Sequence, residues 1–204
     1  MQIQKEEIRN AILKSAEAEF FKYGFEKASI RRIMKAAGTT IGNFYNYFKN
    51  KEELFTAIVK PAYDKFLGFL KDHDEADDMN EILKLDIEVL RQVIINQLGG
   101  VNDRFENALV ILIDGSKGTK YENVKEEILA FLSAHFMAHL EKTSLSFKTK
   151  YYGNFSRTAA VGFIEGILDI LRKNYPSKEK ETLITDYILF FTLGTFALLK
   201  KPLS

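Results

Sequence analysis

Helical periodicity is the feature that most constrains this chain. Apolar residues recur at the three-to-four-residue spacing of an amphipathic helix along most of its length, whereas alternating strand patterns are scarce. The 204 residues contain only three prolines, at Pro61, Pro176 and Pro202. Because proline ends or kinks a helix, so few of them leave room for long helices. The sequence therefore predicts an all-α fold.

Four helices are expected in the first third of the chain. Ser29, Thr40 and Asn50 stand where N-caps of the second, third and fourth helices are expected, because their short polar side chains accept hydrogen bonds from unpaired helical N–H groups. Pro61 lies inside the fourth helix, so we expect a kink or break there. The expected helices span residues 5–23, 30–37, 41–48 and 51–70.

The remainder of the chain is also expected to be helical. The segment 71–80 is acidic and lacks an apolar pattern, and 114–122 is rich in glycine and polar residues, so both are expected to be connections. Further helices are expected over residues 81–98, 104–113, 124–142, 154–175 and 178–201.

Composition excludes several kinds of site. The chain has no cysteine, which rules out disulfides, thiolate zinc sites and cysteine nucleophiles. His135 and His139 have a spacing that can hold a metal, but no third ligand is evident, so we expect neither metal nor cofactor. The longest apolar run, 188–199, is shorter than the roughly 20 residues of a membrane span. With a charged N-terminal segment and no signal peptide pattern, a cytoplasmic protein is expected.

Charge is divided unevenly along the chain. Residues 1–51 carry ten Lys and Arg against five Asp and Glu, whereas 52–204 carry nineteen against twenty-three. A basic head (residues 1–50) on a mildly acidic body (residues 51–204) suggests that the head binds a polyanion and the body has another task. The alternative is a chance scatter of surface charge.

Two short helices joined by Gly38-Thr39-Thr40 predict a helix-turn-helix, with the helix over 5–23 completing its core. In this motif the second helix enters the DNA major groove. Four aromatic residues follow the turn. Phe44 and Phe48 lie four residues apart and are expected in the core, while Tyr45 and Tyr47 lie about 100° away and are expected to reach phosphates.

Residues 8–55 resemble the DNA-binding domain of the TetR family of bacterial transcriptional regulators. The likeness rests on "ILKSAEAEFFKYGFEKASI", "RRIMKAAG", the turn, and "IGNFYNYFKNKEELF" in that order. It implies a helix-turn-helix domain over 1–50 and a helical effector-binding and dimerisation domain over 51–204, connected by the helix over 51–70. Beyond residue 60 the likeness rests on length, helical pattern and element order alone.

The resemblance also implies which residues meet DNA. Ile41 stands where the family often has a basic residue, and Asn46 where larger side chains are common, so the operator sequence stays open. Arg31 and the two tyrosines have plainer alternatives as solvated or half-buried surface residues. The implied contact residues are Arg31, Thr40, Ile41, Gly42, Asn43, Tyr45, Asn46, Tyr47 and Lys51.

The last two helices are expected to lie antiparallel across Pro176-Ser177. The second is apolar nearly all round, and the first offers small residues that allow close helix approach. Two such hairpins would form the four-helix dimer interface that the family uses; the alternative is a buried hairpin in a monomer. Expected interface residues are Ala160, Phe163, Ile164, Ile167, Leu171, Tyr187, Ile188, Phe191 and Leu198.

Aromatic residues in the body suggest a ligand pocket. Residues 52–204 contain twelve Phe and six Tyr, which favours an apolar or aromatic effector, and the acidic balance favours a cationic one. Each residue taken singly also fits an ordinary core position. The candidate lining residues are Tyr63, Phe66, Phe69, Phe105, Phe131 and Phe136.

The sequence thus predicts a homodimeric, ligand-responsive regulator, most simply a repressor released from palindromic double-stranded DNA by a small effector. Two other classes stay open. An enzyme with a helical cavity is disfavoured because no acid-base, nucleophile or metal set is evident. A helical adaptor that binds protein through its C-terminal hairpin would be monomeric and would not bind DNA specifically.

Overall fold

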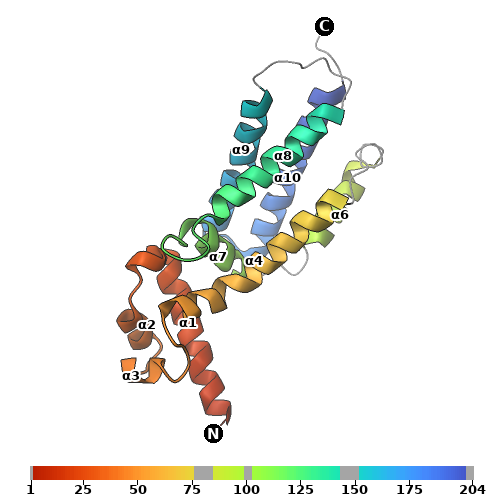
Figure 1. The fold of residues 1–204 in the computed structure, drawn as a ribbon. Helices are drawn as coiled ribbons and strands as arrows, with labels where there is room; N and C mark the ends of the chain where they lie inside the picture. Colours follow the sequence, from red (N-terminus) through yellow and green to blue (C-terminus); the bar gives the residue numbers. More distant parts are fainter. Residues whose placement is uncertain (1, 76–84, 99–102, 143–151, 201–204) are drawn as a thin grey trace. The chain divides into compact units, whose positions relative to one another are not determined.

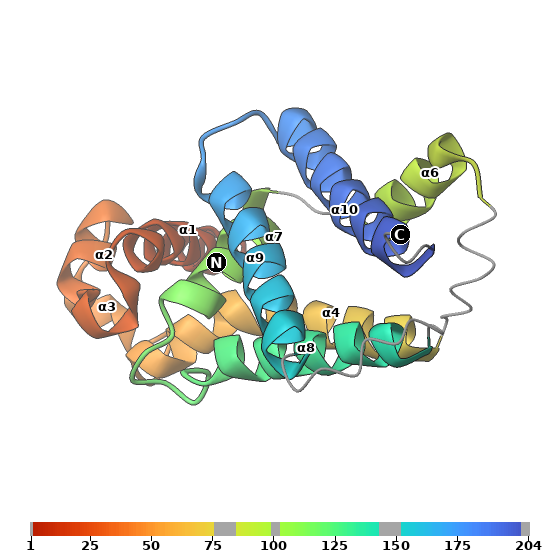
Figure 2. The same ribbon diagram turned by 90° about the horizontal axis from the view of Figure 1, so that it is seen from above.

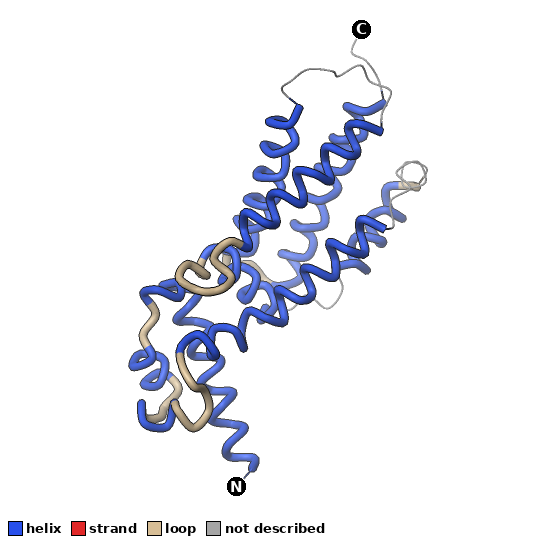
Figure 3. The backbone as a smooth tube through the Cα atoms, in the orientation of Figure 1, coloured by secondary structure: helices blue, strands red, loops and turns tan. Residues whose placement is uncertain are grey.

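The computed structural model describes the backbone of residues 2–75, 85–98, 103–142 and 152–200, and side chains over 5–68, 85–96, 105–138 and 154–194. Within these ranges every regular element is a helix, as Figure 3 shows, which confirms the predicted all-α class. The chain divides into two compact units, which are described separately.

The first unit comprises residues 1–70 and 103–125. It therefore contains the basic head, most of the fourth helix and the later segment 103–125. The predicted functional boundary after residue 50 stays a prediction. Its helices are α1 (Gln2–Lys27), α2 (Ile30–Ala36), α3 (Ile41–Phe44), the greater part of α4 (Lys51–Glu75) and α7 (Asp103–Asp114) (Figure 1).

The second unit comprises residues 71–102 and 126–204. Helix α10 packs against both α6 and α9, and Figure 2 shows α6 and α10 side by side. Leu90, Ile94 and Leu189 form a buried apolar cluster at the α6–α10 contact. The helices of this unit are α6 (Ile87–Leu98), nearly all of α8 (Val124–Lys142), α9 (Tyr152–Arg172) and α10 (Ser177–Lys200).

Helix α1 is interrupted where the sequence predicted its end. Gly24 has φ 68° and ψ 171°, outside the helical region, and a short helical stretch continues to Lys27. A positive φ is readily adopted only by glycine. Ser29 follows this interruption and is the N-cap of α2, as predicted. Its hydroxyl oxygen accepts a hydrogen bond from the Arg32 N–H at 3.5 Å.

Helix α3 is shorter than predicted. It ends at Phe44 instead of residue 48, and a turn follows in which the N–H of Asn46 donates to Asn43 O (3.2 Å) and that of Tyr47 to Phe44 O (2.9 Å). Glycine and asparagine are weak helix formers, and both occur within this segment. Thr40 precedes the helix but its side chain makes no capping bond.

Helix α4 begins at Lys51, where the Asn50 side chain accepts from the Glu53 N–H at 2.8 Å, as expected of an N-cap. It continues through Pro61 to Glu75, so the chain does not break there and the helix is longer than predicted. Burial of its apolar face offsets the hydrogen bond that proline removes. The buried residues on this face are Leu54, Phe55, Ile58, Val59 and Ala62.

Two further helices differ from prediction at their ends. Helix α6 begins at Ile87, where Asp86 accepts from the Glu88 N–H at 2.9 Å; the predicted start, at residue 81, lies outside the described residues. Helix α9 ends at Arg172, three residues before the predicted end. Pro176 disfavours helical geometry at Tyr175, so the helix does not continue to the predicted end.

Candidate nucleic-acid interface

The helix-turn-helix is formed by α2, a short turn and α3. Gly38 adopts φ 70°, and the Thr39 N–H donates to Met34 O at 3.0 Å, so the chain reverses direction tightly after α2. Ile33 and Met34 are fully buried beneath the turn. The two short helices are thereby held on the core that α1 completes, as the sequence predicted.

The four aromatic residues after the turn divide into two faces. Phe44 and Phe48 are 0% and 3% exposed, with ring centroids 5.9 Å apart. Tyr45 is 65% exposed and Tyr47 is half-buried. The predicted core position of the two phenylalanine rings is therefore confirmed, and Tyr45 is exposed as expected. Phosphate contact by the two tyrosines stays a prediction.

Most of the other predicted contact residues are exposed. Ile41 is 46% exposed, an unusual position for a large apolar side chain, and Asn43 is half-buried. Their binding roles remain predictions, but their exposure leaves them accessible. The exposed members of the set are Arg31, Thr40, Ile41, Gly42, Tyr45 and Asn46.

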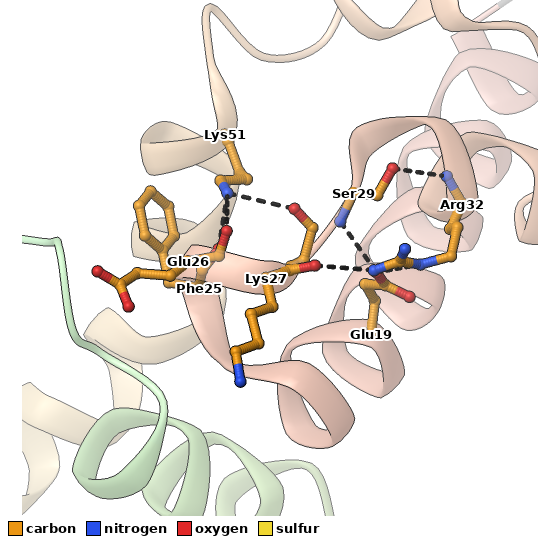
Figure 4. A network of polar contacts seen from close by, with 8 residues as sticks. Glu19, Phe25, Glu26, Lys27, Ser29, Arg32 and Lys51 are labelled. Carbon is orange, nitrogen blue, oxygen red and sulfur yellow. Dashed lines mark hydrogen bonds and ion pairs between the residues drawn. The ribbon is translucent and has the colours of Figure 1, made fainter.

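Lys51, which the resemblance implies as a DNA contact, is bonded within the chain, and its role on DNA stays a prediction. Its ammonium donates to the carbonyl oxygens of Phe25 (2.6 Å), Glu26 (3.3 Å) and Ala28 (3.2 Å), and lies 4.4 Å from the centre of the Phe25 ring (Figure 4). Burial lowers the pKa of Lys51, and nearby Glu26 offsets this in part. The ammonium therefore ties the start of α4 to the end of α1.

A second polar network fixes α2 on α1 (Figure 4). Glu19 Oε1 accepts from the Ser29 N–H at 2.9 Å and from Arg32 Nε at 2.7 Å, while Arg32 Nη2 donates to Lys27 O at 2.8 Å. Burial raises the pKa of Glu19, but the bonds from Arg32 and Ser29 outweigh it, so the pKa is lowered overall. No local sequence pattern indicated this role of Arg32.

The α7–α8 loop reaches the same region of the first unit. The Phe25 N–H donates to Gly115 O at 2.8 Å, and a Cβ placed on Gly115 would lie 3.3 Å from the Gly24 Cα. Both backbone polar groups of Phe25 are thus hydrogen-bonded: its N–H donates to Gly115 O, and its carbonyl accepts from Lys51. No sequence pattern indicated this junction.

The predicted pocket residues fall in both units. In the first, the Tyr63 ring meets that of Tyr121 edge-on at 5.4 Å, Phe66 is half-buried, and Lys65 lies 4.8 Å from the centre of the Phe105 ring. The Phe69 side chain lies outside the described residues. These contacts are those of packed aromatic side chains, and a shared ligand pocket stays a prediction.

In the second unit, Phe131 and Phe136 flank His135. The Phe131 and His135 rings are nearly parallel at 6.4 Å, and Phe136 also meets Phe163 edge-on at 6.0 Å. Phe163 contacts Phe191 in turn, at 5.3 Å, so rings from α8, α9 and α10 form a continuous series. No group of three or more metal-ligating side chains occurs among the described residues.

Helices α9 and α10 approach closely, as their small residues predicted. The Tyr187 hydroxyl donates to Gly162 O at 2.6 Å, and a Cβ on Gly166 would lie 2.1 Å from Tyr187. Among the expected interface residues, Ala160, Ile164 and Leu171 are buried within the chain itself. Phe163, Ile167, Tyr187, Ile188 and Phe191 are half-buried, and the Leu198 side chain lies outside the described residues.

The exposed apolar residues of α10 were missing from that expectation. Leu183, Phe190 and Leu193 are 41%, 71% and 40% exposed. Their spacing of seven and three residues places them on one face of the helix, which we term the α10 apolar face. Nowhere in the described ranges is a helix both long and apolar enough to cross a membrane.

Comparison with known proteins agrees with this architecture. Residues 12–58 match the model for bacterial regulatory proteins of the tetR family. Over 94 residues the chain is 28% identical to the HTH-type transcriptional repressor Rv1474c of Mycobacterium tuberculosis (42% of this chain, 50% of that protein). Over 96 residues it is 28% identical to the HTH-type transcriptional regulator TtgR of Pseudomonas putida (46% of each chain). The matches thus span about half the length of these relatives.

The helical arrangement extends the likeness beyond the head. A TetR family transcriptional regulator from Chloroflexus aurantiacus superposes with a TM-score of 0.55 over 96% of this chain and 89% of its own, at 16% identity. Identity this low shows a shared fold and nothing finer. With the matched helix-turn-helix, it places the body in the same architecture. Residues 12–58 thus match the DNA-binding domain of the tetR family of bacterial regulatory proteins.

Proposed function

We propose that this chain is a ligand-responsive, DNA-binding transcriptional regulator, most simply a repressor. The observation that carries the proposal is the division of the α3 region into two faces. Phe44 and Phe48 anchor the segment in the core, while Tyr45 and Asn46 are left at the surface beside the turn. A surface built in this way can place a hydroxyl against phosphate and an amide against a base edge.

The charge of the head supports the same proposal. Residues 1–51 carry twice as many basic as acidic residues, and Arg31 on α2 is exposed. Arg31 is free to contact DNA, whereas Arg32 is engaged with Glu19. We assign DNA binding to the head, with α3 and its following turn in the major groove and α2 bracing it.

Homodimer formation is the second part of the proposal. A dimer presents two heads to successive major grooves about one helical turn apart and so favours a palindromic operator. The α10 apolar face supports this, because Phe190 is 71% exposed and is flanked by Leu183 and Leu193. Apolar groups gathered on one helix face are typical of protein–protein contacts.

Effector control is the third part. We assign effector binding to the body, where the ring series of Phe136, Phe163 and Phe191 offers surface for an apolar or aromatic molecule. An effector weakens DNA binding only through its differential affinity for the two states of the dimer. Helix α4 is suited to transmit the conformational change, since it directly follows the head in the chain and forms the first part of the body.

Selection of bound duplexes from a random DNA pool by the purified protein, at physiological salt, tests the proposal. A palindromic sequence should be enriched, and the complex should contain two protein chains per duplex. Addition of aromatic and cationic small molecules to that complex should identify compounds that release the DNA. Retention of duplexes without sequence enrichment would contradict the proposal and favour phosphate binding by a basic surface.

A further inference from the structure

Three polar side chains form a hydrogen-bonded series across the turn and α3. Asn43 Nδ2 donates to Thr39 Oγ1 at 3.0 Å, and Asn46 Nδ2 donates to Asn43 Oδ1 at 2.9 Å. Asn46 is exposed, whereas Thr39 and Asn43 are half-buried. The series therefore runs from the partly covered turn out to Asn46, the surface residue that the resemblance implies near the base edges.

The series restrains the exposed side chain of Asn46, which the backbone of the turn leaves free to rotate. Helix α3 ends at Phe44, so Asn46 lies in the turn that follows. Its N–H donates to Asn43 O (3.2 Å), and the N–H groups of Tyr47 and Phe48 donate to Phe44 O, so the backbone is held while the side chain is not. An exposed amide in a turn samples several rotamers, and ordering it on DNA costs free energy. A side-chain bond to a half-buried neighbour removes much of that freedom before binding.

The bond also settles which groups of Asn46 face outward. An asparagine amide has one carbonyl oxygen and two N–H donors. One N–H is used on Asn43, so Oδ1 and the second N–H remain for DNA. An acceptor and a donor side by side match adenine, whose N6 donates and whose N7 accepts in the major groove. Because the amide is held in one orientation, it presents this pair in one order only.

We propose that Asn43 and Thr39 are positioning residues that fix the Asn46 amide for adenine on one strand of the operator. The inference rests on the proposed function, and it assigns Asn43 a role other than the direct DNA contact that the family resemblance implies. Asn43 is half-buried and bonded at both its oxygen and its nitrogen, so it acts on DNA through Asn46.

The test uses the full-length protein and the duplex that the wild type selects. Binding is measured to that duplex and to a second one, in which the adenine–thymine pair contacted by Asn46 is reversed. The proteins compared are the wild type, Asn43→Ala, Asn46→Ala, the double variant and Thr39→Val. Reversal should weaken wild-type binding by about tenfold or more. Asn43→Ala and Thr39→Val should lose most of this discrimination. Asn10→Ala, the same kind of change at an exposed position of α1, should retain it.

The double variant separates positioning from direct contact. If Asn43 acts through Asn46, removing it in the Asn46→Ala background changes nothing further, so the two effects are not additive. Additive losses would overturn the inference, as would an Asn43→Ala protein that keeps full discrimination. Thermal unfolding checks that each variant is folded, and Thr39→Val keeps the volume of the side chain while removing its hydroxyl. If the wild type enriched no sequence, the proposed function itself would fail, an outcome distinct from these.

Discussion

The ammonium of Lys51 donates to the Phe25 carbonyl at 2.6 Å and lies 4.4 Å from the centre of the Phe25 ring. Two further carbonyls, of Glu26 and Ala28, complete its surroundings. A cation among three carbonyl oxygens at the end of a helix is favourably placed, since that end carries partial negative charge. Lys51 therefore joins α1 to α4, and its removal should be felt first as a loss of stability.

Replacement of Lys51 by methionine tests this. The change keeps much of the side-chain length but removes the donor, leaving the carbonyls less well satisfied. We expect the free energy of unfolding to fall by about 1.5–3 kcal/mol, the range for hydrogen bonds to charged groups. Urea unfolding measures it. An unchanged unfolding free energy, with DNA affinity lowered equally for all sequences, would instead assign Lys51 to phosphate contact.

The Gly24–Gly115 contact should not accept a side chain. A Cβ on Gly115 would lie 2.9 Å from Ile111 O and 3.3 Å from the Gly24 Cα, both backbone atoms that cannot move aside easily. Gly115→Ala should destabilise the protein by about 1–3 kcal/mol, as overpacking does.

Gly68→Ala is the matched control for this change. Gly68 lies in helix α4 with nothing within 4 Å of the Cβ position, and alanine there should stabilise by roughly 0.5–1 kcal/mol. Thermal unfolding of the two variants should therefore shift in opposite directions. Equal shifts would mean that the Gly24–Gly115 approach is not tight in solution.

Glu19 should make the first unit sensitive to acid. Its pKa lies below the ordinary value, and a carboxylate with a lowered folded pKa contributes stability fully above its unfolded pKa. This contribution is lost as pH falls through the lower, folded pKa. Wild type should lose more stability than Glu19→Gln between about pH 6 and pH 3.

At neutral pH, Glu19→Gln should cost about 1–2 kcal/mol, because the bonds from Arg32 and Ser29 become weaker. Denaturant unfolding across the pH range measures both effects. Parallel pH profiles for the two proteins would show that the Glu19 bonds do not stabilise the charged carboxylate.

The close approach of α9 and α10 depends on Gly166. A Cβ there would lie 2.1 Å from the Tyr187 ring and hydroxyl, which is itself held by the bond to Gly162 O. Gly166→Ala should destabilise the protein by about 1–3 kcal/mol, and a smaller residue at 187 in the same chain should recover part of the loss. Absence of any recovery in the double variant would contradict direct contact between the two positions.

The faces of the α3 region were predictable because they follow from local spacing. Phe44 and Phe48 lie four residues apart, and one buried face was enough to turn Tyr45 outward. The caps at Ser29 and Asn50 were predictable for the same reason: each acts on a residue three positions ahead. These features need no knowledge of the rest of the chain.

The interactions that the sequence did not reveal join distant segments. Arg32 bonds Glu19 thirteen residues away, and Gly115 meets Phe25 from a loop ninety positions later. Lys51 fitted a DNA contact by position, but the carbonyl partners of its ammonium depend on where α1 ends. Burial of Ala160 and Ile164 within the chain likewise depends on which helices pack first, which periodicity alone does not settle.

Two substitutions at the surface of the head should separate affinity from sequence choice. Tyr45→Phe removes a hydroxyl from a 65% exposed ring and should weaken binding to all duplexes by about 1 kcal/mol or more, since phosphate contacts carry no sequence information. Asn46→Ala should relax preference at one base position by about 1–3 kcal/mol. Equilibrium binding to the selected and to a shuffled duplex measures both; identical effects of the two changes would argue against the assigned roles.

The most direct test of sequence-specific DNA binding is the ratio of two equilibrium affinities of the wild type at physiological salt. One is for the duplex that it selects from a random pool, and the other for a shuffled duplex of the same composition. A specific regulator should prefer the selected duplex by about 10³-fold or more. A ratio near one would contradict the assignment, because binding would then come from phosphate charge alone.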